Sequence, residues 1–236
     1  AGAAGVNFTD ATSVVLTGAG NIALADIDMK AADHTFDASD ATGDLTLGFT
    51  NTAQDQTIKT GSGKDAITMD DLDSDDVVDG GDGADTLTSG IEATLPTLLN
   101  VANVETVKLR IDDPAAALTT DVRLATGMTD LHIIGTANSD ENITVNGLGA
   151  GTTVRLESLD ETSGGDTHTL NYVSGVTSAA IVMDEFGDSD AQSHSLTIDS
   201  QITSATISTD DAEANISTLT GTGLTSLTLA VGATDG

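Results

Sequence analysis

The sequence predicts an all-β chain that folds as a β-solenoid, a parallel β-roll with two short strands in each repeat of about 20–26 residues. Three observations predict it: short phrases recur at a regular interval, apolar and polar residues alternate within each phrase, and Gly-rich turns separate the phrases. A repeat this short cannot bury its own apolar side. Stacked copies form a continuous core, and this favours the solenoid over isolated hairpins.

The first repeat is visible in two sets of residues that keep a twenty-residue interval. These are Gly43, Gly63 and Gly83, and, four residues after each, Leu47, Ile67 and Leu87. Each Gly is therefore expected to open a turn that leads into a short strand whose apolar residue points into the core.

The second repeat is the phrase apolar-Thr-polar-apolar-x-apolar, as in "MTDLHI", "VTSAAI", "ITSATI" and "LTSLTL". Its first inward positions are expected at Val107, Leu131, Val154, Ala179, Ala205 and Leu227. A second strand series is expected at 142–145, 168–172, 194–198 and 215–218. Helix signals are weak, except that a helical turn or two is expected after Ile91, broken by Pro96.

Charge and composition limit the function. The chain has 236 residues, with 7 Lys and Arg against 38 Asp and Glu, and a net charge of −31. Nucleic acid and anionic membranes would repel a chain with this charge, whereas metal cations or basic surfaces would not.

No apolar run is long enough to insert into a membrane as a helix. Aromatic residues make up 2% and Cys is absent, so we expect a thin aliphatic core without disulfides or thiolate metal sites. Since the first residue is not Met, we expect a fragment of a longer chain.

The stretch "GGDGADTLT", residues 80–88, follows the nonapeptide Gly-Gly-x-Gly-x-Asp-x-apolar-x at every specified position. Residues 60–68 follow it with Thr in place of the first Gly, and residues 71–79 are a degenerate copy. Glycines let the backbone turn tightly and present carbonyl oxygens, and Asp adds a carboxylate, so the pattern suits Ca²⁺. The candidate metal ligands and turn residues are Gly61, Gly63, Asp65, Asp76, Gly80, Gly81, Asp82, Gly83 and Asp85.

If two nonapeptides form one coil, the turns at 60–68 and 80–88 lie on the same side, one coil apart, with the degenerate copy opposite. One Ca²⁺ between them could be held by Asp65, Asp85 and turn carbonyls. An EF-hand is a rival for overlapping residues, because Asp71, Asp73 and Asp75 occupy loop positions one, three and five. Its sixth position lacks Gly and its twelfth lacks Glu.

The loops from first to second strands are acidic, whereas the return loops are nearly uncharged. Stacked carboxylates about 4.8 Å apart repel by roughly 1 kcal/mol in water and 3–4 kcal/mol at an effective dielectric near 20. These loops therefore contain either further cation sites or a solvated acidic face. The residues concerned are Asp184, Glu185, Asp188 and Asp190 in one loop, and Asp210, Asp211 and Glu213 in another. The four His residues are expected to face solvent from strands.

The stretch from Thr60 to Thr88 resembles the calcium-binding β-roll of RTX proteins, which Gram-negative bacteria export by type I secretion. Together with the Thr-rich repeats that follow, it is similar to the surface-layer (S-layer) proteins and large adhesins of that group. The resemblance implies a calcium-stiffened solenoid that assembles into a lattice on the cell surface. The expected organisation is a calcium-binding β-roll at 1–100, continuous with Thr-rich solenoid repeats at 101–236.

No motif for catalysis stands out. "GSGKD" lacks the upstream Gly and the Ser or Thr of a phosphate loop, and neither His-Glu-x-x-His nor Gly-x-Ser-x-Gly occurs. We therefore expect a protein without a catalytic role. The resemblance implies an extracellular S-layer protein that binds copies of itself, and that binds cell-surface polysaccharide through another part of the parent chain. The alternatives are a stalk or binding module of an RTX adhesin, and the β-roll tail of a secreted hydrolase.

Overall fold

Strands account for every regular element that the structure describes. The computed structural model describes residues 6–8, 11–29, 33–50, 54–91, 97–111, 117–135, 142–159, 166–184, 194–210 and 216–231. In these residues the strands pair in parallel and no helix is present, so the described part has no helix that could cross a membrane. The predicted all-β solenoid is confirmed.

The chain divides into two compact units. Unit 1 comprises Ala1–Gly90, Leu98–Lys108 and Leu124–Met128, and unit 2 comprises Ile91–Thr97, Leu109–Arg123 and Thr129–Gly236. Three strands contain residues of both units: β9 (Thr86–Ile91), β10 (Thr97–Leu98) and β12 (Thr106–Ile111).

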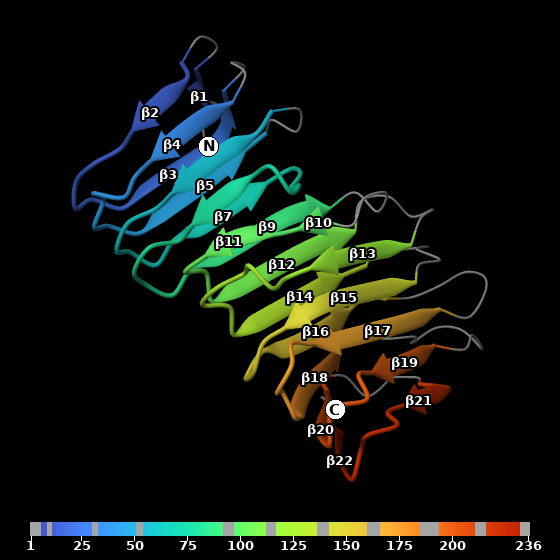
Figure 1. Cartoon of the computed structure of the whole chain (residues 1–236). Coiled ribbons are helices and arrows are strands. Elements are labelled where there is room, and N and C mark those ends of the chain that lie inside the picture. Colours follow the sequence, from blue (N-terminus) through green and yellow to red (C-terminus); the bar gives the residue numbers. More distant parts are fainter. Residues whose placement is uncertain are drawn as a thin grey trace, which may run out of the picture. The chain divides into compact units, whose positions relative to one another are not determined.

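Unit 1 alternates its strands between two parallel sheets (Figure 1). The first sheet contains, in spatial order, β1 (Val6–Asn7), β3 (Ile22–Asp28), β5 (Leu45–Phe49), β7 (Ala66–Met69) and β9. The second contains β2 (Ser13–Val15), β4 (His34–Asp37), β6 (Gln56–Lys59), β8 (Val77–Asp79) and β11 (Asn100–Ala102). One strand from each sheet and the two turns that join them form one coil.

Unit 2 has the same alternation. Its first sheet contains β14 (Asp130–Ile134), β16 (Thr153–Glu157), β18 (Ser178–Asp184), β20 (Ser204–Thr209) and β22 (Ser226–Val231). Its second contains β13 (Leu118–Asp121), β15 (Ile143–Leu148), β17 (Thr167–Tyr172), β19 (Ser195–Ile198) and β21 (Thr218–Thr220).

The core of unit 1 follows from the period of two in its strands. Leu45, Leu47 and Phe49 of β5 are buried while the residues between them are not, and β7 buries Ile67 and Met69 in the same way. The inward residues of the two sheets meet across the coil, where the rings of Phe36 and Phe49 pack edge to face with centroids 5.4 Å apart. Burying each large apolar side chain contributes about 1.5–3 kcal/mol.

The twenty-residue register is confirmed in unit 1. Leu47 pairs with Ile67, and Ile67 pairs with Leu87, in adjacent parallel strands. The degenerate copy leads into β8, which lies in the second sheet and pairs with β6. It therefore lies on the other side of the coil from the two better copies, as predicted.

The register of unit 2 differs from the prediction at one step. Leu131 pairs with Val154, as expected, but Val154 pairs with Ile181 rather than with Ala179. Ala179 pairs with Ala205 in the following coil and is still buried, since a shift of two residues keeps a side chain on the same face. Leu227 pairs with Ala205 as predicted, but its exposed fraction is 43%.

Two further predictions about strands need correction. The fourth strand of the second series is β21 at Thr218–Thr220, later than the predicted 215–218, because Leu219 is the residue in register with Leu196. The helical turn expected after Ile91 is not found in its described part, where β10 and β11 are strands. Residues 92–96 lie outside the described residues.

The prediction that all four histidines face solvent is wrong for three of them. His34, His168 and His194 are buried, and only His132 keeps partial exposure. His168 lies on the inward side of β17 together with Leu170 and Tyr172, and its ring stacks on that of His194 with centroids 6.0 Å apart. These polar rings occupy inward positions of the strand pattern and are therefore buried, although polar side chains were expected to face solvent.

Candidate metal centre

The glycine turns of unit 1 stack with their backbones in contact. The N–H of Asp82 donates to the carbonyl oxygen of Gly61 at 2.8 Å, and the N–H of Ser62 donates to that of Ala41 at 3.0 Å. A Cβ atom added at Gly61, Gly81 or Gly83 would come within 3.0 Å of a carbonyl oxygen of the preceding coil. Gly is required there because no side chain fits between stacked turns.

Carboxylates form a hydrogen-bonded column beside these turns. The N–H of Leu45 donates to Oδ1 of Asp65 at 2.8 Å, and the N–H of Asp65 donates to Oδ1 of Asp85 at 2.8 Å. The N–H of Asp85 in turn donates to Oε2 of Glu105 at 2.7 Å. Each carboxylate therefore binds the backbone of the coil before it, at a fixed interval of twenty residues.

Asp65 and Asp85 are each 1% exposed, so the column is shielded from water where the nonapeptides lie. The Oδ2 atoms of both residues are buried and accept no hydrogen bond from any residue in the described ranges. Burial of a carboxylate oxygen without a partner costs free energy, and more so when the group is charged. These two oxygens, one coil apart, are the unsatisfied acceptors of the column.

Burial is the main reason why the pKa of Asp85 rises to about 6. The hydrogen bond from the Asp65 N–H opposes the shift, and the negative charges of Asp65 and Glu105 add to it. At neutral pH, above this pKa, Asp85 is mostly ionised although it is buried, and a divalent cation would relieve both the desolvation and the repulsion.

Backbone carbonyl oxygens lie close to the Oδ1 atoms of the same two carboxylates. The carbonyl oxygen of Gly63 and Oδ1 of Asp85 both lie close to the point where a Cβ of Gly83 would be. One coil earlier, the carbonyl oxygen of Gly43 and Oδ1 of Asp65 lie close to the equivalent point at Gly63. The turns thus place carbonyl and carboxylate oxygens together, which is the hard donor set that Ca²⁺ prefers. The residues present fit this ion.

The described residues contain no group of three or more His, Cys, Asp or Glu side chains placed to hold a metal ion. An ion between Asp65 and Asp85 would therefore take its remaining ligands from turn carbonyls and water. Gly80 belongs to the same neighbourhood, since a Cβ there would come 2.8 Å from Oδ2 of Asp85.

Asp76, on the other side of the coil, has both oxygens bonded. Oδ1 accepts from the N–H of Gln56 at 2.8 Å and Oδ2 from the N–H of Asp73 at 3.0 Å. Burial raises its pKa to about 6, against the effect of these hydrogen bonds. Residues 71–76 lie between β7 and β8, and strands rather than helices flank them, which excludes the EF-hand alternative.

Two other predicted ligands that the structure describes, Asp82 and Asp184, do not add carboxylate oxygens to the column. Asp82 is exposed and enters the stack through its backbone N–H. Asp184 lies in unit 2, where Arg155 donates to its Oδ2 at 3.3 Å and also to Asp210 of the next coil. Arg155 thereby supplies a positive charge to two of the stacked carboxylates. Asp188 and Asp190, with Glu185, Asp211 and Glu213, lie outside the described residues.

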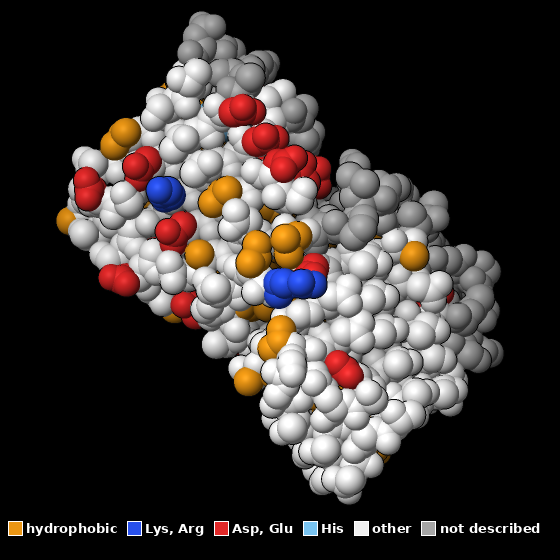
Figure 2. Space-filling view, viewed as in Figure 1, with side chains coloured by type: hydrophobic (Ala, Val, Ile, Leu, Met, Phe, Trp, Pro, Cys, Tyr) orange, Lys and Arg blue, Asp and Glu red, His pale blue; other side chains and the backbone are white. Residues whose placement is uncertain are grey.

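Exposed carboxylates also stack along the edge that leads into the second sheet of unit 1. Asp33 and Asp55 directly precede the paired residues His34 and Gln56, and Asp75 directly precedes Asp76. Loss of hydration and then the charges of Asp33, Asp75 and Asp73 raise the pKa of Asp55. Figure 2 shows one row of neighbouring acidic side chains on the N-terminal end of the chain, with other acidic side chains scattered around it.

Glu105 and Asp44 also take part in these stacked carboxylate contacts, although neither was among the predicted site residues. Glu105 lies twenty residues after Asp85, so the interval already found between Asp65 and Asp85 could have revealed it. Asp44 follows Gly43 of the same repeat, and its Oδ1 accepts from the N–H of Lys64 at 2.9 Å.

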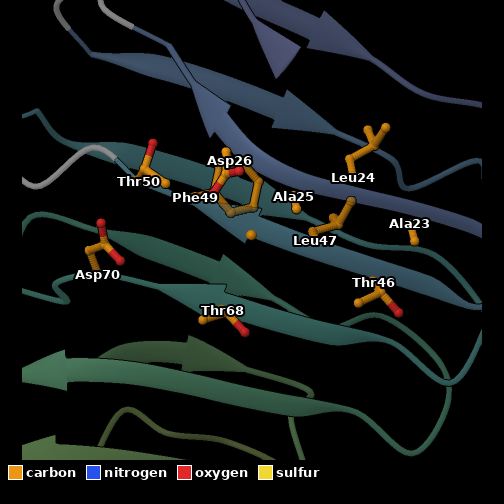
Figure 3. Close-up of a pocket in the computed structure, with 11 residues that line it drawn as sticks. Ala23, Leu24, Ala25, Asp26, Thr46, Leu47, Phe49, Thr50, Thr68 and Asp70 are labelled. Atoms are coloured by element: carbon orange, nitrogen blue, oxygen red, sulfur yellow. The ribbon is translucent and has the colours of Figure 1, made fainter. Parts of the chain in front are cut away.

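A shallow groove on unit 1, also not foreseen, has a volume of about 310 Å³. It lies where β3 bulges between Leu24 and Ile27, so that Ala25 and Asp26 face only Gly48 on β5. Asp26 has a positive φ of 53°. Figure 3 shows Thr46 of β5, Thr68 of β7 and Asp70, which directly follows β7, around the groove.

Comparisons of the chain with protein-family models, with curated proteins and with solved structures give no match.

Proposed function

We propose that the chain is a calcium-stiffened structural β-solenoid from an extracellular bacterial surface protein of the self-assembling S-layer type, without a catalytic role. The observation that carries the calcium proposal is the pair of buried, unpartnered Oδ2 atoms of Asp65 and Asp85, one coil apart. Asp65, Asp85 and carbonyl oxygens of the glycine turns would hold the ion. Bound Ca²⁺ would supply positive charge that links successive coils.

The small number of carboxylates in the proposed site supports a location outside the cell. A site with two carboxylates and otherwise neutral ligands belongs with extracellular modules, whose dissociation constants are about 10⁻⁴–10⁻³ M. Calcium reaches such concentrations outside cells. A net charge of −31 fits the same setting, because bound cations would neutralise part of it.

The test is thermal unfolding of the full chain, followed by circular dichroism, after exhaustive chelation and again after addition of Ca²⁺ or Mg²⁺. Calcium at millimolar concentration should raise Tm by several degrees, and Mg²⁺ should do so less, because it requires a tighter octahedral site. Asp85→Ala should abolish most of the rise. Asp40→Ala is the matched control, because Asp40 is an exposed carboxylate of the same unit. An unchanged Tm on calcium addition would refute the proposal.

The S-layer assignment rests on the resemblance of residues 60–88 to RTX nonapeptides, and electron microscopy can test it separately. A lattice protein should form ordered sheets or filaments when calcium is added. An adhesin stalk or the tail of a hydrolase should stay monomeric under the same conditions. Calcium-dependent stability without assembly would keep the metal site and reject the lattice.

A further inference from the structure

A polar groove lies in unit 2 where β13, β15 and β17 end. Its volume is about 600 Å³, and its lining includes Asp121, Arg123, Asn146, Gly147, Asn171 and Ser174. Asp121 pairs in register with Asn146, and Nδ2 of Asn171 donates to Oδ1 of Asn146 at 2.9 Å. Three successive coils thus each contribute one planar polar side chain to the groove.

The groove depends on a bulge in β15. The register of β15 against β17 shifts between Val145 and Leu148, and Gly147 adopts a positive φ of 81°. A Cβ atom at Gly147 would come 2.8 Å from Oδ1 of Asp121 and from the backbone nitrogen of Arg123. A bulge changes the direction in which nearby side chains point. Because Gly147 has no side chain, the space beside it stays open, and polar neighbours line this space.

The charges in the groove are paired. The Arg123 guanidinium donates to both oxygens of Asp121, through Nε at 3.0 Å and through Nη2. Within the described ranges, Nδ2 of Asn146 and Oδ1 of Asn171 take part in no hydrogen bond. The groove therefore presents amide donors and acceptors side by side, with little net charge in a strongly acidic chain.

We propose that this groove binds a neutral, linear polysaccharide that runs across the coils. Hydroxyl groups both donate and accept, so alternating amide and guanidinium groups suit a chain of sugars. The coils rise by about 4.8 Å, close to the length of one sugar in an extended glycan, so each coil can meet one sugar. The net charge of −31 disfavours an anionic polymer, and the Arg123–Asp121 pair leaves no bare carboxylate for a cation.

The sheet beside the groove also presents uncharged hydrogen-bonding groups. Five threonines, one from each coil, pair in register on its outward face: Thr119, Thr144, Thr169, Thr197 and Thr220. Their hydroxyls repeat at the spacing of the coils and carry no charge. A glycan in the groove would therefore lie against an uncharged, regular surface. The proposal does not depend on calcium in unit 1.

The experiment is affinity electrophoresis of the full chain in native gels that contain amylose, pullulan, laminarin or hydroxyethylcellulose, with hyaluronate as the anionic contrast. At least one neutral polymer should retard the chain, and hyaluronate should not. The double variant Asn146→Ala/Asn171→Ala should weaken the retardation at least tenfold, and Arg123→Ala should weaken it too. Thr206→Ala, on the outward face of the other sheet, is the control and should bind as the original chain does.

Circular dichroism and Tm establish that each variant is folded. If the double variant unfolds, Arg123→Ala decides, because the exposed side chain of Arg123 can be removed without opening the core. The proposal is overturned if no neutral polymer retards the chain, if hyaluronate retards it more strongly, or if Thr206→Ala reduces binding as much as the groove variants.

Discussion

The backbone N–H of Asp65 donates a hydrogen bond to Oδ1 of Asp85 at 2.8 Å, across one coil and twenty residues of sequence. The nonapeptide carboxylate thus has two distinct oxygens. Oδ1 joins neighbouring coils directly, whereas Oδ2 is buried without a partner and is the oxygen that we assign to calcium. Substitutions can separate the two roles, since an amide keeps an acceptor oxygen and loses the charge.

Asp85→Asn should keep the hydrogen bond from Asp65 and lose most of the calcium response. Without metal at pH 7.5, its Tm should equal or exceed that of the original chain, because a buried charge is removed. Asp85→Ala should lose about 1–3 kcal/mol of unfolding free energy, because it leaves the Asp65 N–H unpaired. Chemical denaturation with and without calcium measures both effects. Equal metal-free stability of the two variants would show that the hydrogen bond contributes nothing.

The stability of the metal-free chain should respond to pH through Asp85. Its pKa is about 6 in the folded chain, against about 3.9 in an unfolded one, so the folded state binds more protons between these values. The stabilisation that comes from protonated Asp85 in the folded chain is therefore fully present below about pH 4 and is lost as pH rises through 6. The free energy of unfolding of Asp85→Asn, relative to the original chain, should increase from pH 4.5 to pH 7.5. Denaturation in chelator at both pH values measures it, and a constant difference would contradict the assigned shift.

Gly81→Ala should destabilise the chain more than Gly151→Ala, although both glycines have nearly the same φ, +80° and +81°. The left-handed conformation costs an L-residue about 1–2 kcal/mol at either position. At Gly81 the new Cβ would also meet the carbonyl oxygens of Thr60 and Gly61, whereas nothing lies within 4 Å at Gly151. We expect a cost of about 1 kcal/mol for Gly151→Ala and at least 3 kcal/mol for Gly81→Ala, measured by denaturant unfolding. Equal costs would mean that the turns are not in contact.

His168→Leu should make unit 2 more resistant to acid. Burial, and then the neighbouring His194, lower the pKa of His168 to about 3, while an unfolded His titrates near 6.5. Between pH 6.5 and pH 3, His168 is protonated in the unfolded chain but remains neutral in the folded chain. The free energy of unfolding therefore falls as pH decreases towards 3. Leu is neutral and matches the neighbours in register, Ile143 and Leu196. The free energy of unfolding of the variant minus that of the original chain should be ~3 kcal/mol larger at pH 4.5 than at pH 7.5, as measured by urea unfolding.

The column of carboxylates was largely predictable because it lies on an exact repeat. Gly63 and Gly83, and Asp65 and Asp85, share one interval, and parallel strands convert equal intervals into vertical stacking. The same interval leads to Glu105, which was missed because its segment does not follow the nonapeptide pattern. The acidic loops of unit 2 could not be assigned in this way, since their lengths vary and a variable loop has no fixed register.

The sequence by itself determined the fold class, the alternation of two strand series and the register of the glycine turns, because all three follow from local periodicity. Only the tertiary structure decided which polar groups are inside. His168 and His194 stack in the core, Asp76 satisfies both its oxygens, and the bulge at Gly147 opens a groove. These outcomes depend on what the next coil places opposite each residue, and a side chain's type does not specify its neighbour one coil away.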